Sequence, residues 1–325
     1  MDKSRIIFYT YVNMKKEDPS NFIIYIFKHQ LRARRFLFRT IHKLIGQSRP
    51  SSYPYPSGDS FRALADHIHD ETGSFAPKDV KKGDIVFVSN PLTLQYLREI
   101  HPQIENPYIL IEHNGDFDIG KEVADLIDDK IIKFYAQDLI YAHEKIVPIP
   151  IALENWHYYM NGIPSVFNRI KRKNSKRLPL KKDKVLYRFS LHTNPNERKP
   201  ALEYVSKHPM FETFTDMLPP TLHIRKLTGY KFVVSPPGNA IESCRTWEAL
   251  YVRTVPIVKD SVAMRYFVSL GLPIWIVKEW NELDMLNEET LKVKYESFMK
   301  NPNWEPLHMD FWIKLIDEDR KTYLK

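Results

Sequence analysis

Short apolar segments separated by helical stretches are the feature that most restricts the fold of this chain. They form two series that follow one another along the sequence. The first contains "GDIVFVS", "PYILIEH", "KIIKFYAQ" and "KIVPIPIALEN", and the second contains "VLYRFS", "KFVVS", "VPIV" and "LPIWIV". Such alternation is typical of α/β domains with parallel sheets. We therefore expect an α/β fold that binds its ligands at the carboxyl ends of the strands.

The length of 325 residues is sufficient for two domains. We predict an N-terminal α/β domain over residues 1–155, a basic linker over 156–184, a C-terminal α/β domain over 185–279 and a helical tail over 280–325. Nine of the sixteen residues in "RIKRKNSKRLPLKKDK" are Lys or Arg. A solvated linker and a polyanion contact both fit this run. The N-terminal "MDKSRIIFYTYV" is expected to be a first strand rather than a secretion signal.

The formal net charge of +8 favours anionic partners without distinguishing phosphorylated ligands, acidic glycans, nucleic acid and anionic lipid. Cys244 is the single cysteine, which excludes an internal disulfide framework and suits a reducing, cytoplasmic compartment. The longest apolar run, "FIIYIF", is too short to cross a bilayer. The basic and apolar helical stretch 21–46 fits either a peripheral contact with an anionic membrane or a domain helix with a solvated basic face.

The segment "KFVVSPPGNAIESCRTWEALYVRTVPIVKDS" (231–261) predicts a strand, a turn, a helix and a second strand. Asn239 and Glu242 have the spacing of a helix N-cap with reciprocal capping. On the helix that follows, Arg245 and Glu248 lie on the same side as apolar residues. They could neutralise each other in a core, or they could bind the diphosphate and ribose of a nucleotide near the helix N-terminus.

Residues 231–258 of this segment resemble the donor-site segment of exostosin-like glycosyltransferases and their ribitol xylosyltransferase relatives. The resemblance implies two facing Rossmann-like domains of GT-B type and a nucleotide-sugar donor as substrate, with no cofactor and no metal. It also implies that Arg245 holds the diphosphate, that Glu248 binds the ribose, and that Gly238 and Asn239 belong to the donor loop. The chain departs from the family pattern at Ala240 and at Arg253-Thr254, and fucosyltransferases have a similar donor segment.

A second basic pair follows the strand "VLYRFS". Arg198 and Lys199 lie in or just beyond a strand-to-helix loop, "LHTNPNERK". Fixed cations there could stabilise the charge that develops on a leaving diphosphate in a metal-free enzyme. Solvated surface charges are the alternative interpretation.

The first half of the chain is expected to supply the acceptor site. In "YILIEHNGDFDIG", Asp116 is the first candidate for a general base and His113 the second, since both come at or after the end of a strand. Turn formation is the competing role of these residues, and Asp116 with Asp118 also fits an Asp-x-Asp metal pattern. The chain is thus predicted to be an inverting, metal-independent glycosyltransferase acting on a glycan or lipid-linked acceptor. A non-enzymatic polyanion-binding protein is the alternative, without a recognisable module for specific nucleic-acid binding.

Overall fold

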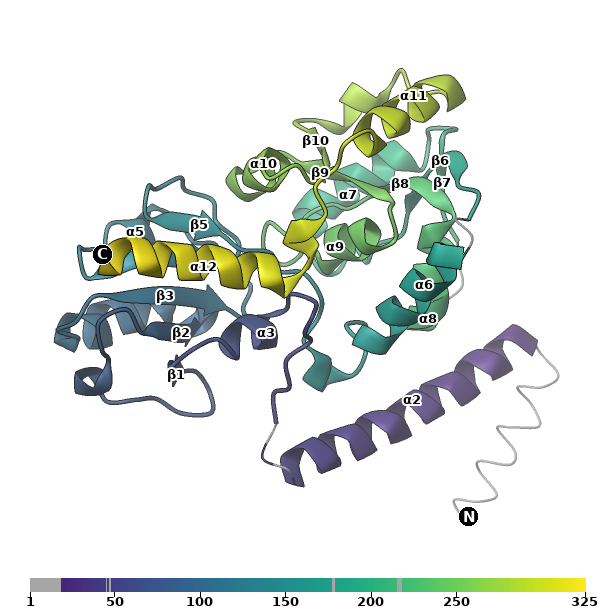
Figure 1. Cartoon of the computed structure of the whole chain (residues 1–325). Helices are drawn as coiled ribbons and strands as arrows, with labels where there is room; N and C mark the ends of the chain where they lie inside the picture. Colours follow the sequence, from purple (N-terminus) through teal and green to yellow (C-terminus); the bar gives the residue numbers. More distant parts are fainter. Residues whose placement is uncertain (1–18, 45, 47, 177–178, 215–217) are drawn as a thin grey trace, which may run out of the picture.

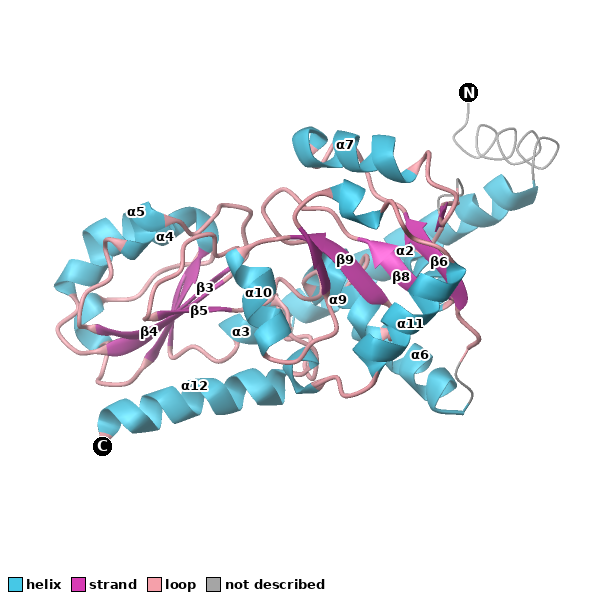
Figure 2. Cartoon of the chain, turned by 90° about the horizontal axis from the view of Figure 1, so that it is seen from above, coloured by secondary structure: helices cyan, strands magenta, loops and turns pink. Residues whose placement is uncertain are grey.

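A computed structural model describes residues 19–44, 46, 48–176, 179–214 and 218–325, with the side chains of 19–29, 31 and 174–176 left out. The strand expected within residues 1–12 lies outside the described residues. Two parallel five-stranded sheets, one in each half of the chain, form the framework (Figures 1 and 2). The prediction of an α/β fold with two facing halves is therefore confirmed.

The first sheet has its strands in chain order, β1-β2-β3-β4-β5, and all neighbours are parallel. Their bounds are β1 His67–His69, β2 Ile85–Ser89, β3 Tyr108–His113, β4 Ile131–Ala136 and β5 Ile146–Pro148. β2 and β3 are buried along their whole length. They therefore read as continuous apolar runs in the sequence, as expected for strands that are covered on both faces.

The second sheet has the order β10-β9-β8-β6-β7, again with parallel neighbours throughout. Its strands are β6 Lys182–Tyr187, β7 Phe211–Glu212, β8 Tyr230–Val234, β9 Val255–Lys259 and β10 Trp275–Val277. From β6 the chain first goes to β7 on one side and then to β8 on the other. The strand order thus reverses between β6 and β8, and such a reversal opens a crevice for ligands at the carboxyl ends of the two strands.

The α-helices mostly flank these sheets, although α2 lies apart from both of them (Figure 1). The α-helices are α2 Pro19–Leu44, α3 Gly58–Arg62, α4 Thr93–Gln95, α5 Lys121–Ala124, α6 Pro164–Lys176, α7 Pro195–Val205, α8 Pro220–Thr228, α9 Cys244–Tyr251, α10 Val262–Ser269, α11 Glu288–Met299 and α12 Met309–Leu324. Two short helical turns, η5 (Trp156–Tyr158) and η7 (Glu305–Leu307), lie where the chain passes from one half to the other.

One hydrophobic core joins the two halves. Phe87 and Ile111 of the first sheet belong to the same buried cluster as Trp247 of α9, Phe267 of α10 and Trp312 of α12. The predicted C-terminal tail therefore crosses back to the first sheet, and α12 lies along it in Figure 1. A hydrogen bond of 2.6 Å from Tyr135 Oη to Asp319 Oδ2 adds to this packing. The shared core fixes the position of one half against the other.

The segment 156–184 differs from the linker expected for it. It contains η5, α6 and the start of β6. Val166, Phe167 and Ile170 of α6 are buried in a cluster with Leu186 of β6. The apolar side of α6 packs on the second sheet, while Lys171, Arg172 and Lys173 are exposed. Because one side of this helix is highly charged, the segment was expected to be a linker. Its other side is apolar and belongs to the core.

Candidate functional site

A cavity of about 680 Å³ opens at the carboxyl ends of the first sheet. Residues that directly follow β3, β4 and β5 line it, and the second half contributes Asn239 and Cys244. Its polar lining residues include both neutral hydrogen-bonding groups and charged side chains: Arg49, Glu71, Ser89, His113, Asn114, Asp116, Gln137, Glu154, Asn155, Tyr158 and Asn239. Apolar residues such as Leu92, Ile151 and Leu153 complete the lining. Such a lining suits a ligand with many hydroxyl groups.

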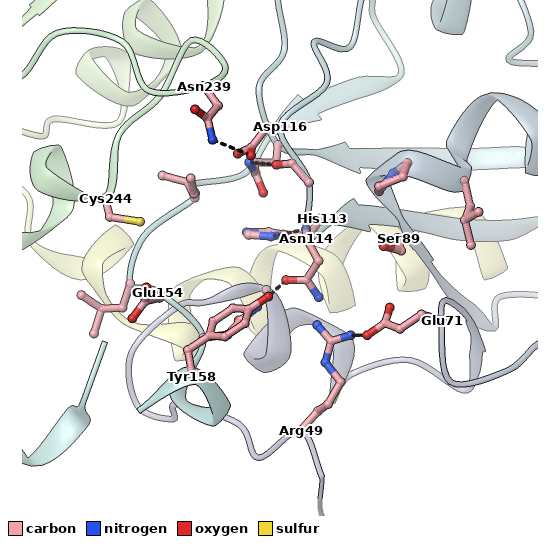
Figure 3. Close-up of a pocket in the computed structure, with 18 residues that line it drawn as sticks. Arg49, Glu71, Ser89, His113, Asn114, Asp116, Glu154, Tyr158, Asn239 and Cys244 are labelled. Carbon is pink, nitrogen blue, oxygen red and sulfur yellow. Dashed lines mark hydrogen bonds and ion pairs between the residues drawn. The ribbon is translucent and has the colours of Figure 1, made fainter. Parts of the chain in front are cut away.

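Asp116 lies in the turn after β3 and is exposed in this cavity. The turn needs the left-handed backbone that Asn114 adopts, with φ of 68°. Asp116 Oδ2 accepts a hydrogen bond of 2.9 Å from Asn239 Nδ2 of the other half, and Figure 3 shows these two side chains pointing toward each other. The carboxylate is thus held at the boundary of the two halves, where a base for an acceptor hydroxyl would be needed.

His113 lines the same cavity but both of its ring nitrogens already have partners. Nδ1 accepts from the backbone N–H of Asn114 at 2.7 Å, and Nε2 lies 3.1 Å from the carbonyl oxygen of Pro150. These contacts fix the tautomer with the proton on Nε2. Burial lowers the pKa of His113 to about 4. The geometry argues against His113 as a general base and assigns it to the support of the turn.

Glu154 is a second carboxylate in this cavity, and our sequence interpretation did not include it. It follows β5 in the segment "IPIALEN", and its Oε2 accepts from the backbone N–H of Asn161 at 2.8 Å. The charge of Glu154 also contributes to raising the pKa of Glu248. A single Glu in a strand-to-loop segment gives no signal in the sequence that it will face a cleft.

A second cavity, of about 420 Å³, lies at the point where the strand order of the second sheet reverses. Arg188 directly follows β6, Arg198 comes from α7, and Arg245 and Glu248 come from α9. Cys244 lines both this cavity and the first one, so the two adjoin. A ligand with two or more negative charges suits a cavity with three guanidinium groups.

Arg245 and Glu248 are brought together at this cavity, as predicted, but they do not form an ion pair with each other in the described structure. Arg245 Nε is buried and has no hydrogen-bond partner among the described residues. Burial lowers the pKa of Arg245, the charge of Glu248 opposes this shift, and the nearby Arg188 adds to it. Burial raises the pKa of Glu248 to about 7, although Arg245 opposes this shift. Arg245 and Glu248 thus interact electrostatically without a direct ion pair among the described contacts, and both line the second cavity.

The predicted capping box is wrong. α9 begins at Cys244, and its N-cap residue is Ser243, whose side chain makes no capping hydrogen bond. The Glu242 carboxylate accepts instead from Trp247 Nε1 at 3.0 Å and from the backbone N–H of Ile151 at 3.2 Å. Asn239 lies within the turn that is closed by the hydrogen bond from Gly238 N–H to Glu242 O, and it faces the first cavity. The shift brings the helix N-terminus closer to Arg245, which is its second residue.

Gly238 has a structural role in that turn. Its backbone N–H donates to the carbonyl oxygen of Glu242 at 2.8 Å, and a Cβ at this position would lie 2.4 Å from the same oxygen. Asn194 Nδ2 donates to the Gly238 carbonyl oxygen at 2.9 Å. Neither cavity is lined by Gly238. We therefore expect it to shape the loop without contacting the ligand.

Arg198 and Lys199 are separated by the structure. Arg198 is buried in the wall of the second cavity, where Nε donates to Pro237 O and Nη1 to Ser190 O, both at 2.8 Å. It joins the loop after β6 to the loop after β8, and burial lowers its pKa to about 10. Lys199 is exposed and does not line the cavity. Adjacent helix residues project about 100° apart, so only one of the pair faces inward.

Arg188 and His223 are further residues of the second cavity that our sequence interpretation missed. Burial, together with the positive charges of Arg245 and Arg188, lowers the pKa of His223 to about 4. Arg188 does follow a predicted strand in "VLYRFS", and this position is the signal that could have identified it. His223 comes from α8 and has no such signal.

Among the described residues, no group of three or more His, Cys, Asp or Glu side chains has an arrangement that could hold a metal ion. Over the same residues, no helix combines the length and the apolar character needed to cross a membrane.

No protein-family model and no curated protein sequence matches the chain. Several solved structures show limited similarity, and three of them serve as examples. They are an α,α-trehalose 6-phosphate synthase from Burkholderia multivorans (TM-score 0.43, 9% identity, 75% of this chain and 73% of that one), a GtfA/B complex (0.37, 11%, 75% and 58%) and TarM (0.36, 12%, 71% and 54%). At these TM-scores and identities, the similarities are not grounds for an activity or a substrate.

Proposed function

We propose that this chain is a GT-B glycosyltransferase that moves a sugar from a nucleotide-sugar donor to a glycan or lipid-linked acceptor, with inversion and without a metal. One observation carries the proposal: a cavity with three arginines at the reversal point of one sheet adjoins a cavity with an exposed carboxylate on the other half. The resemblance of residues 231–258 to exostosin-like donor segments supports the same assignment.

In this proposal the donor occupies the second cavity. Arg245 and the first turn of α9 bind the diphosphate, and Arg188 and Arg198 complete the positive wall. Glu248 accepts hydrogen bonds from the ribose hydroxyls once the donor is bound. Cys244, which lines both cavities, marks where the anomeric carbon would lie.

The acceptor occupies the first cavity with a hydroxyl at Asp116. Asp116 takes the hydroxyl proton while that oxygen attacks the anomeric carbon from the side opposite the diphosphate. A bond forms between the acceptor oxygen and the anomeric carbon, and the bond from that carbon to the diphosphate oxygen breaks. The leaving nucleoside diphosphate gains negative charge, which the fixed guanidinium groups stabilise without having to reorganise. Displacement from the opposite side gives inversion.

Thermal unfolding with UDP, GDP, CDP and dTDP tests the donor assignment. A nucleotide at 100 times its dissociation constant should add about 2.7 kcal/mol to the free energy of unfolding. A panel of the matching nucleotide sugars then identifies the donor by hydrolysis, and a preference for GDP-fucose would favour the fucosyltransferase alternative. Turnover should persist in excess EDTA. Stabilisation by any polyanion, abolished by salt and indifferent to the base, would instead favour a non-enzymatic polyanion-binding protein.

A further inference from the structure

Helix α2 lies apart from both sheets (Figure 1) and is attached through one narrow contact. The Phe38 ring lies 5.1 Å from the Trp156 ring and 4.8 Å from the Tyr159 ring, measured between centroids. Arg39 Nε donates to the carbonyl oxygen of His157 at 3.1 Å. Arg35 Nη1 lies 3.6 Å from Met160 Sδ. Among the described side chains, α2 thus contacts η5 and the two residues after it, while Leu37, Ile41 and Leu44 are left exposed.

An apolar row covers part of the free surface of α2. Leu37, Ile41 and Leu44 have the spacing i, i+4, i+7 and therefore lie on one side of the helix. They are 59%, 46% and 80% exposed, and Phe36 beside them is 75% exposed. A contiguous apolar surface left in water indicates a site of interaction.

Basic side chains of the described part of α2 lie beside the apolar row, and Arg35 and Arg39 among them also contact the η5 region. A depression of about 320 Å³ on the helix is lined by Arg32, Arg35, Phe36, Arg39, Thr40 and Lys43. The 26-residue sequence of α2 contains no Asp or Glu. A second copy of this helix would bring like charges together without acidic partners. The phosphates of an anionic lipid bilayer match the basic groups, and its acyl chains match the adjacent apolar row.

We infer that α2 binds the surface of an anionic lipid bilayer. Leu37, Ile41 and Leu44 enter the boundary between headgroups and acyl chains, and the basic side chains lie at the lipid phosphates. Tyr158 belongs to η5, which holds α2, and it also lines the first cavity. This inference about α2 does not depend on the proposed enzymatic activity.

Co-sedimentation of the full-length chain with vesicles tests the inference. Binding is expected to vesicles of phosphatidylcholine with phosphatidylglycerol and not to phosphatidylcholine alone, and salt should weaken it. L37E/I41E should abolish binding. M285E/V293E is the matched control, because Met285 and Val293 are exposed apolar residues of another surface (85% and 60%), and it should bind as the unmodified chain does. R32Q/K43Q should weaken binding by about 25-fold, because each basic residue is expected to contribute about fivefold.

Equal binding by L37E/I41E and M285E/V293E would overturn the inference, as would the absence of binding to anionic vesicles. The inference would also be wrong if sedimentation velocity shows a dimer that L37E/I41E dissociates while vesicles are not bound, because the apolar row would then join two copies of the chain. Unfolding midpoints of the variants are expected to match the unmodified chain, since the substituted side chains are exposed.

Discussion

Asn239 donates a hydrogen bond of 2.9 Å to Asp116, and this contact joins the loop after β8 to the turn after β3. The same loop is fixed three residues later, where the backbone N–H of Glu242 donates to Asp138 Oδ1 at 3.1 Å. Both acceptors follow strands of the first sheet. The loop after β8 is thus positioned by the strand ends of the first half, so changes in this loop are expected to affect both cavities.

The first prediction concerns Asp116 as general base. Asp116→Asn keeps the shape of the side chain and removes its ability to take a proton. Turnover should fall by about 100-fold or more, with nucleotide affinity nearly unchanged, because the residue belongs to the first cavity only. Steady-state kinetics and nucleotide titration measure the two quantities.

Asp118→Asn is the matched control for this variant, since Asp118 is exposed in the same turn but lines neither cavity. It should turn over normally. If Asp116→Asn were nearly as active as this control, the turn after β3 would not supply the base. Product stereochemistry from NMR would then be the next measurement, because retention at the anomeric carbon requires a different mechanism.

The second prediction concerns Arg245 in the second cavity. Arg245→Ala removes a guanidinium group whose buried Nε has no partner among the described residues. Affinity for a nucleoside diphosphate should fall by about 2–4 kcal/mol, the usual effect of losing a charge-assisted contact. Lys199→Ala removes an equal charge from an exposed position and should leave affinity within about 0.5 kcal/mol. Equal affinities of the two variants would contradict the donor-site assignment.

Eight of the ten described strands were predictable because their signal is local: buried parallel strands such as β2 appear as apolar runs. The short strands β1 and β7 were not among the predicted segments. The start of α9 could not be predicted in this way. The Glu242 carboxylate, which the capping box required, instead accepts hydrogen bonds from the Ile151 backbone and the Trp247 side chain. The same limit applies to the site. Arg188, Arg198 and Arg245 converge only because the strand order reverses between β6 and β8, and no single segment contains this information.

The third prediction concerns the effect of pH through Glu248. The pKa of Glu248 is about 7 in the folded chain and 4.5 for an unperturbed glutamate, so Glu248 binds its proton more tightly in the folded state. Between these values the free energy of unfolding should fall as pH rises, by up to about 3 kcal/mol from this group. Asp138 should contribute to the pH dependence of stability with the same sign, because burial raises its pKa to about 7.

Comparison with Glu248→Gln isolates the contribution of Glu248. Urea unfolding at pH 5 and pH 8 should show a smaller pH dependence in this variant than in the unmodified chain. An identical dependence would mean that Glu248 is ionised in the folded state across this range. Nucleotide affinity should also be lower in the variant, because a neutral amide accepts hydroxyl hydrogen bonds more weakly than a carboxylate.

The last prediction separates His113 from the chemistry. His113 is buried, has partners at both ring nitrogens and stacks on Phe61 with 5.8 Å between ring centroids. His113→Ala should therefore lower the free energy of unfolding by about 2–4 kcal/mol through lost packing and unpaired backbone groups. The residual folded protein should keep turnover within a few-fold, in contrast to Asp116→Asn.

The pH dependence of stability checks the same residue independently. The pKa of His113 is lowered from 6.5 to about 4 in the folded chain, so the unfolded chain binds the proton first as pH falls. The stability that this group contributes is complete above pH 6.5 and is lost between about pH 6.5 and 4. His113→Ala should remove that part of the acid dependence. If His113→Ala were fully stable but lost turnover, His113 would again be a candidate for the general base.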